Sequence, residues 1–253
     1  MTKLIHDSEI PWCTPEAKQW ELYKLRVKDL APTQFAVGRA EVAVRAGRLK
    51  RKFKKDQREM KALHDYLRVR PIPVVIRKSS FYLVDHHHLV RALYEALHEE
   101  QGAKLCAFVE VLANYSSLER VYFWKQMHKR NWVYLFDKEG AGPQQPERLP
   151  SQVKDLAFDP YRSLAWIVRD HHGYLKNDAP FSEFKWANFF RSRILLDQDI
   201  LAGKHTFDNF AFDVDAKGQL VLSDDGKEVV EEAMFLAASP EARGLPGFRG
   251  QAT

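Results

Sequence analysis

Residues 70–93 read RPIPVVIRKSSFYLVDHHHLVRAL and contain the clearest strand and helix signals in the chain. Two runs rich in β-branched and aromatic residues, 71–77 and 81–85, flank the polar turn KSS, which predicts a β-hairpin with prolines at its entrance. From 88 to 100, apolar residues recur every three or four positions, as they do on the buried face of a helix. The sequence therefore predicts that a strand runs directly into a helix through Asp-His-His-His, residues 85–88.

Further strands and helices follow from the same two periodicities. Alternation at Tyr23, Leu25 and Val27 predicts a short strand, and the apolar run 104–113 predicts a buried one. Helical spacing predicts helices over 37–49, 56–67, 116–130, 160–172, 182–202 and 226–238. Strands and helices are therefore both expected in the first half, with mainly helices in the second, which is an α+β organisation.

Local signals refine these boundaries. Asp56 is expected to cap its helix, and residues 116–119 match a capping box. Residues 131–137 are expected to form another strand, the Gly- and Pro-rich stretch 138–151 a linker, and 210–222 a hairpin.

The domain organisation follows from these elements. We expect a domain over 18–113, a mainly helical region with a small hairpin over 114–240, and a loose tail over 241–253.

Composition limits the class of protein. The chain has 253 residues, of which 45% are hydrophobic, so a globular core is expected. No apolar run is long enough to span a membrane, and the N-terminus lacks the apolar region of a secretory signal. Two cysteines, Cys13 and Cys106, are too few for a disulfide framework. We therefore expect a cytoplasmic protein, and the sequence leaves its oligomeric state open.

Positive charge is concentrated in one segment. The net charge is +5, and residues 48–58, RLKRKFKKDQR, hold seven basic residues and one acidic residue. Such a run suits the phosphates of a nucleotide or nucleic acid. It is also compatible with a solvated helix, or with neutralising a polyphosphate in the site. Phe53 is its only aromatic residue, so this run does not indicate a stacking surface for single strands.

Three interpretations of residues 85–88 remain open at this point. Asp85 could simply cap the next helix while the histidines face solvent. Asp85 with two histidines could bind a divalent metal ion, with Asp170, His171 and His172 as distant donors. We favour the third interpretation, anion binding, because the first-turn amides and the dipole of a helix attract phosphate where a strand ends.

Two other histidine and aromatic patterns have structural explanations. RDHHGY, residues 169–174, is expected to end a helix with Gly173 as the C-terminal cap. Phe184, Ala187 and either Phe190 or Arg191 share one face of the 182–202 helix and are expected to pack into the core.

Larger patterns resemble a known family. ELYKLRVKDLAPTQFAVGRAEVAVR, residues 21–45, and RPIPVVIRKSSFYLVDHHHLVRAL resemble the ParB/sulfiredoxin superfamily, in particular the branch labelled ParB-like nucleases. The resemblance covers about 22–113, and PFSEFKWANFFRSRI at 180–194 resembles the C-terminal part of that branch. It implies a small mixed sheet with flanking helices.

Relatives in this superfamily place an anion at the corresponding turn. In ParB the turn holds nucleotide phosphates, in sulfiredoxin it joins ATP to a peroxiredoxin sulfinate, and in free-serine kinases it serves phosphoryl transfer. This chain has no Gly after Asp85 and no Cys in the turn, which excludes sulfiredoxin chemistry. It also lacks the paired arginines of ParB and an evident helix-turn-helix after residue 114. The DHH phosphoesterases share Asp-His-His but need an upstream Asp-x-Asp, which here occurs only downstream, at 197–199 and 213–215.

The preferred hypothesis is a ParB-like nuclease or a related phosphoester or phosphoryl-transfer enzyme. Asp85 or His86 would act as general base or orient a divalent ion, Mg or Mn, and Arg45 would stabilise developing charge. The alternatives are a non-catalytic module that binds a nucleotide or nucleic acid, and a free amino-acid kinase. A bound nucleotide is a further cofactor candidate.

Phosphate binding is assigned to neighbouring residues. We expect His87 and His88 to hold the phosphate together with the helix N-terminus and Arg91. Gln34 could hydrogen-bond the substrate, and Lys50 could share the charge-stabilising role.

Overall fold

The computed structural model describes residues 9–52, 57–196 and 212–250, which form two compact units that interleave along the chain. The ranges are 1–35, 49–137 and 142–156 for the first unit, and 36–48, 138–141 and 157–253 for the second. The expected domain bounds follow chain order instead and stay a prediction. Each unit is described by itself below.

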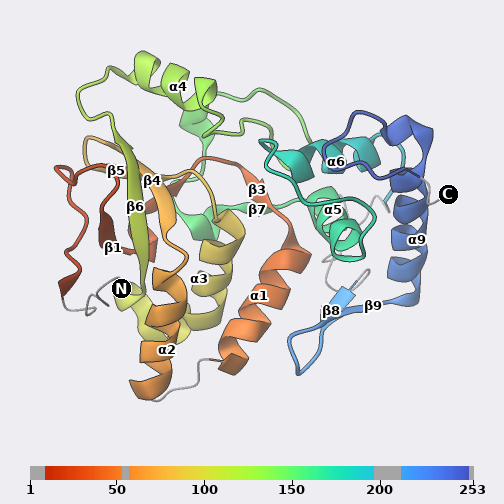
Figure 1. Ribbon diagram of the computed structural model, residues 1–253, viewed down its shortest axis with the longest axis horizontal. Coiled ribbons are helices and arrows are strands. Elements are labelled where there is room, and N and C mark those ends of the chain that lie inside the picture. The colour runs from red at the N-terminus through yellow and green to blue at the C-terminus, as the bar shows by residue number, and fades with distance from the viewer. Residues whose placement is uncertain (1–8, 53–56, 197–211, 251–253) are drawn as a thin grey trace. The chain divides into compact units, whose positions relative to one another are not determined.

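A mixed sheet forms the centre of the first unit (Figure 1). Within the described residues, five strands pair in the order β1-β6-β4-β5-β2. Their bounds are β1 Leu22–Arg26, β2 Leu30–Pro32, β4 Ile72–Arg77, β5 Ser80–Leu83 and β6 Cys106–Asn114. β4 and β5 are antiparallel, with Arg77 opposite Ser80, whereas β4 pairs with β6 and β5 with β2 in parallel. The predicted hairpin and the small mixed sheet are confirmed.

Helices cover this sheet with the apolar faces that the periodicity predicts. Their bounds are α2 Gln57–Arg68, α3 His87–Gln101 and α4 Arg120–Lys129, and the bounds of α1, which the two units share, are Arg39–Lys52. α2 packs against β6 and buries Leu63 and Leu67. α3 buries Leu89, Leu93 and Leu97, which recur at one-turn intervals. α1 belongs to the second unit up to Arg48 and to the first unit from Leu49.

Two local predictions in the first unit are wrong. α4 begins at Arg120, and Glu119 is its N-cap without a side-chain cap hydrogen bond, so the capping box does not form. The amide and hydroxyl groups of Ser116 instead donate to Asn114 Oδ1, which holds this segment in a turn after β6. Residues 131–137 form no strand and contribute one isolated bridge, between Tyr134 and Gln34.

The second unit is mainly helical. Its elements are β3 Ala36–Val37, β7 Ala157–Phe158, α5 Pro160–Asp170, α6 Ser182–Arg191, β8 Phe212–Val214, β9 Leu220–Leu222, α9 Asp224–Ala238 and the part of α1 up to Arg48. β3 pairs with β7 in parallel, and β8 with β9 antiparallel, which confirms the predicted second hairpin. The core stacks the rings of Tyr174 and Trp186 at 4.3 Å between centroids. The expected packing residues Phe184, Ala187 and Phe190 are all buried.

Gly38, the residue before α1, lies in a closely packed turn. A Cβ atom at this position would lie 3.0 Å from Ser163 N and 3.1 Å from Arg162 O. The backbones of the β3–α1 turn and α5 therefore approach each other so closely that a side chain at Gly38 would require them to shift by a few tenths of an ångström.

The predicted ends of α5 and α6 need correction. α5 ends in a Schellman motif, in which His172 N–H donates to Arg169 O and Gly173 N–H to Val168 O. The left-handed residue of this motif is His172, with φ 63°, and not Gly173 as expected. α6 ends at Arg191, and the remainder of the predicted helix beyond 196 lies outside the described residues.

The described part of the tail, 241–250, is packed rather than loose. Ala242 is fully buried, Pro246 O accepts from Trp186 Nε1 (2.7 Å), and Gly247 O accepts from Leu175 N (2.8 Å). The expected cap Asp56 lies outside the described residues, as does the stretch 251–253. Among the helices that the structure describes, none combines the length and apolar character needed to cross a bilayer.

Candidate functional site

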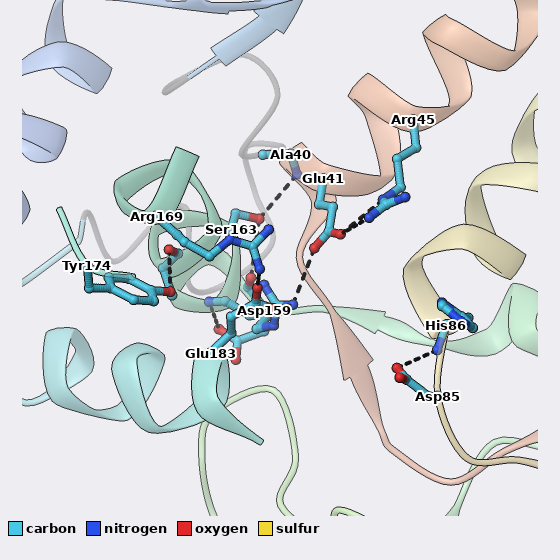
Figure 2. A network of polar contacts seen from close by, with 12 residues as sticks. Ala40, Glu41, Arg45, Asp85, His86, Asp159, Ser163, Arg169, Tyr174 and Glu183 are labelled. Carbon is cyan, nitrogen blue, oxygen red and sulfur yellow. Dashed lines mark hydrogen bonds and ion pairs between the residues drawn. The ribbon is translucent and has the colours of Figure 1, made fainter. Parts of the chain in front are cut away.

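The corner between β5 and α3 has the predicted strand-to-helix form. β5 ends at Leu83, and α3 begins at His87. Between them, His86 takes a left-handed conformation (φ 65°) and serves as the N-cap, and its N–H donates to Asp85 Oδ1 at 2.6 Å (Figure 2). The first turn has no side-chain cap and no acidic residue, so the positive end of the helix dipole is not neutralised within α3.

The three histidines have different environments. Asp85 is exposed, whereas His86 and His88 are half-buried. His87 is buried, and its Nε2 accepts a hydrogen bond from the Thr33 amide (3.1 Å). Because that amide can only donate, the ring proton lies on Nδ1, and burial lowers the pKa of His87 to about 3. His87 is therefore neutral at pH 7. It connects the corner to Thr33 through this hydrogen bond and does not present a cation to a ligand.

Thr33 connects the segment Pro32–Gln34 to the corner. Its hydroxyl donates to Leu83 O at 2.6 Å, and its carbonyl accepts from the Tyr134 amide at 2.9 Å. Gln34, the residue expected to contact substrate, is therefore in the same unit as the corner, but only 7% of its surface is exposed.

Arg91 fixes a loop. Its Nη1 donates to the carbonyl oxygens of Val153 (3.2 Å), Lys154 (2.7 Å) and Leu156 (3.0 Å), and its Nε to Glu95 (2.9 Å). Three carbonyls and a carboxylate thus share one guanidinium, which anchors residues 153–156 against α3. This arrangement differs from the expected role of Arg91 as a phosphate ligand.

The remaining predicted cations lie elsewhere. Arg45 belongs to the second unit and forms an ion pair with Glu41, one turn earlier on α1, at 2.8 Å. Lys50 and Arg51 are exposed on the last turns of α1, and the basic run continues into residues 53–56, outside the described residues. His171 and His172, considered as distant metal donors, form the C-terminal cap of α5.

A buried ionic network in the second unit was missed by sequence reasoning, except for Arg45. Arg162 is 3% exposed and pairs with Glu41 (3.3 Å) and with Glu183, and Figure 2 labels these two carboxylates. Glu183 also pairs with Arg169. The two carboxylates are therefore each shared by two arginines, which engages their oxygen atoms and favours a structural role over metal binding.

Asp159 continues this network at the start of α5. Its carboxylate accepts from the Arg162 amide (3.1 Å) and pairs with Arg191 (2.7 Å). Burial raises the pKa of Asp159, while Arg191 and the α5 amide act in the opposite direction. Nearby, Tyr174 donates its hydroxyl proton to Ala165 O (2.7 Å), and Ser163 Oγ accepts from the Ala40 amide (3.3 Å).

Some donors in the network stay unsatisfied. Arg162 Nε and Nη1 and Arg191 Nε are buried without a hydrogen-bond partner among the described residues. The Arg162 guanidinium lies 5.5 Å from the centre of the Phe184 ring, and the Arg191 guanidinium 5.0 Å from that of Tyr161. Aromatic faces thus replace part of the missing hydrogen bonding. The available sequence signal was an arginine inside the mostly apolar run YRSLAWIV, residues 161–168.

A protein-only metal centre finds no support in the described residues. Within 9–52, 57–196 and 212–250, no group of three or more His, Cys, Asp or Glu side chains could hold a metal ion. At the corner, Asp85 supplies a single exposed carboxylate. A magnesium ion there would need water and ligand phosphates as its other ligands, which is common for this metal.

The fold and the corner define a small mixed-sheet α+β protein with a polar, histidine-rich turn at a helix N-terminus. Residues 23–192 match the family model described as "Putative ParB-like nuclease". The chain belongs to this family.

A solved structure supports the same assignment. The chain is similar to protein Atu1540 from Agrobacterium tumefaciens, with 34% sequence identity over 92% of this chain and 100% of that one, and a TM-score of 0.66. Among curated proteins, no match is found. The fold expected from the resemblance is therefore confirmed.

Proposed function

We propose that this chain hydrolyses phosphodiester bonds of nucleic acid at the β5–α3 corner. The observation that carries the proposal is the exposed carboxylate of Asp85, held 2.6 Å from the His86 amide beside a helix N-terminus without a side-chain cap. A carboxylate, two half-buried imidazoles and a helix dipole are together suited to attract a phosphate and to move a proton. The family description supports the same class of reaction.

The proposed roles of His87 and Arg91 differ from those in the sequence hypothesis, and Arg45, Gln34 and Lys50 have no role in the proposal. The α3 N-terminus and His88 bind the phosphate, and Asp85 or His86 acts as general base for the attacking water. His87 and Arg91 support the corner from within, because both are committed to backbone groups. A divalent ion, Mg or Mn, would bind Asp85 together with the substrate phosphate and would lower the pKa of a bound water.

The test is turnover of labelled single- and double-stranded DNA and RNA, with Mg, with Mn and with a chelator. Asp85→Asn should lower the rate by about 100-fold or more, since positioned proton transfer contributes at least this factor. The matched control is Asp178→Asn, which removes another exposed carboxylate and should leave the rate unchanged.

Two results would contradict the proposal. Equal turnover by Asp85→Asn and the wild type would place the chemistry elsewhere. Tight nucleic-acid binding without turnover under every metal condition would instead support the non-catalytic module that the sequence left open.

A further inference from the structure

α4 has one face in the core and one in solvent. Phe123 and Met127 are fully buried in a cluster with Val75 of β4, and the Phe123 ring lies 4.9 Å from that of Tyr82. The opposite face exposes large side chains, with Val121 75% and Tyr122 57% exposed. Packing therefore explains the inner face and leaves the composition of the outer face unexplained.

The outer face carries positive charge that the protein does not neutralise. Residues 120–130 include no acidic residue. Lys125 and Lys129 are exposed and form no ion pair with any described residue, and Arg130 follows at the C-cap, where its guanidinium lies 5.0 Å from the Trp132 ring centre. Like charges four residues apart cost a helix a few tenths of a kcal/mol. The helix dipole favours a cation in the last turn and offsets this cost at Lys129, but it does not do so at Lys125 in the middle of α4.

An exposed aromatic ring lies on the same stripe. Tyr122 precedes Lys125 by three residues and Lys129 by seven, so the three side chains project from one side of the helix. His128, also exposed, borders the stripe. Arg120 does not contribute, because Glu147 pairs with it at 2.9 Å.

We propose that the outer stripe of α4, formed by Tyr122, Lys125 and Lys129 and followed by Arg130 at the C-cap, binds single-stranded nucleic acid. The cations contact successive phosphates, and the Tyr122 ring stacks on a base, which is how non-specific single-strand sites combine charge with an aromatic platform. The inference deepens the proposed function and rests on it, since it gives the corner a polymeric substrate. It differs from the 48–58 basic run, which has no exposed aromatic residue among its described side chains.

The experiment measures binding of a fluorescently labelled 20-nucleotide oligothymidylate by anisotropy over a salt series. Lys125→Gln with Lys129→Gln should weaken binding about tenfold at 0.1 M salt and reduce the log–log salt slope by about 1.4, or 0.7 for each lost phosphate contact. Tyr122→Ala should weaken binding about fivefold or more at all salt concentrations, and Tyr122→Phe should not.

Two control pairs remove the same charge elsewhere. Lys185→Gln with Lys217→Gln changes two exposed lysines of the second unit and should leave both affinity and slope unchanged. Lys50→Gln with Arg51→Gln tests the basic run. All substitutions are on the surface, so thermal unfolding should shift little.

Separate outcomes distinguish the two proposals. A small phosphodiester, bis(p-nitrophenyl) phosphate, is too short to occupy the corner and α4 together. Its hydrolysis should therefore be unaffected by the α4 variants and abolished by Asp85→Asn. An unchanged salt slope for the Lys125/Lys129 pair would overturn the α4 inference and leave the corner intact. If the wild type cleaves nothing but the Lys125/Lys129 double variant binds the oligonucleotide more weakly, the α4 inference would be supported and the proposed reaction would be overturned.

Discussion

Two strand-to-helix corners of the described residues contain an aspartate, Asp159 between β7 and α5 and Asp85 between β5 and α3. The two aspartates differ in burial and in their partners. At the β7–α5 corner, Asp159 is 1% exposed, caps the helix through the Arg162 amide and pairs with Arg191. At the β5–α3 corner, Asp85 is exposed, and its carboxylate accepts from the adjacent His86 amide rather than from the first turn of α3. An aspartate between a strand and a helix is therefore a buried helix cap and ion-pair partner in one unit, and an accessible carboxylate in the other.

The difference shows that partners, rather than the residue type, determine what an aspartate at such a corner does. Asp159 is followed by Pro160, and its carboxylate is engaged within the protein by the Arg162 amide and the Arg191 guanidinium. Asp85 is followed by histidines, of which one is buried in neutral form and two stay half-exposed. A carboxylate with satisfied partners contributes to stability, and one open to solvent remains available to a ligand.

The largest expected effect comes from removing each carboxylate in turn. Asp159→Ala should lower the free energy of unfolding by about 3–5 kcal/mol, because it leaves the largely buried Arg191 guanidinium without its carboxylate partner and removes the cap of α5. Asp85→Ala should change it by less than about 0.5 kcal/mol, since the side chain is exposed. Urea denaturation followed by circular dichroism measures both.

Asp159→Asn separates the two contributions. It retains the acceptor for the Arg162 amide but not the charge opposite Arg191, so its loss should be smaller than that of Asp159→Ala. Equal losses for Asp159→Ala and Asp85→Ala would remove the contrast between the corners.

An intermediate effect concerns pH and His87. The pKa is about 3 in the folded protein and near 6.5 in the unfolded chain, so the unfolded state binds more protons between these values. Stability from this residue is complete above pH 6.5 and is lost as pH falls toward 3. At pH 5 the loss relative to pH 7 should be roughly 2 kcal/mol.

His87→Gln isolates this effect because glutamine does not titrate, and its side-chain oxygen can still accept from the Thr33 amide. The variant should show a weaker dependence of stability on pH between 7 and 5 than the wild type, by about that amount. Parallel curves for the two proteins would show that His87 is not the buried neutral ring described above.

Sequence reasoning located the elements better than the partners of their side chains. The hairpin, the sheet and the strand-to-helix corner followed from periodicity, which depends on local burial patterns. The burial of His87 could not be derived, because it depends on Thr33, 54 residues away in sequence. The ionic network was missed for the same reason, since Arg162, Glu41 and Glu183 meet only when α1, α5 and α6 pack within the second unit.

The smallest expected effect on stability compares two histidines in left-handed conformations, His86 at the start of α3 and His172 at the end of α5. A non-glycine residue in this region is strained by about 1 kcal/mol, which glycine relieves, although glycine also loses more entropy on folding. His86→Gly and His172→Gly should therefore each raise the free energy of unfolding by no more than about 1 kcal/mol. Activity should separate them: His86→Gly removes an imidazole at the proposed site and should reduce phosphodiester turnover, whereas His172→Gly should not. Equal turnover by both variants would mean that His86 serves the backbone turn alone, as His172 does at the end of α5.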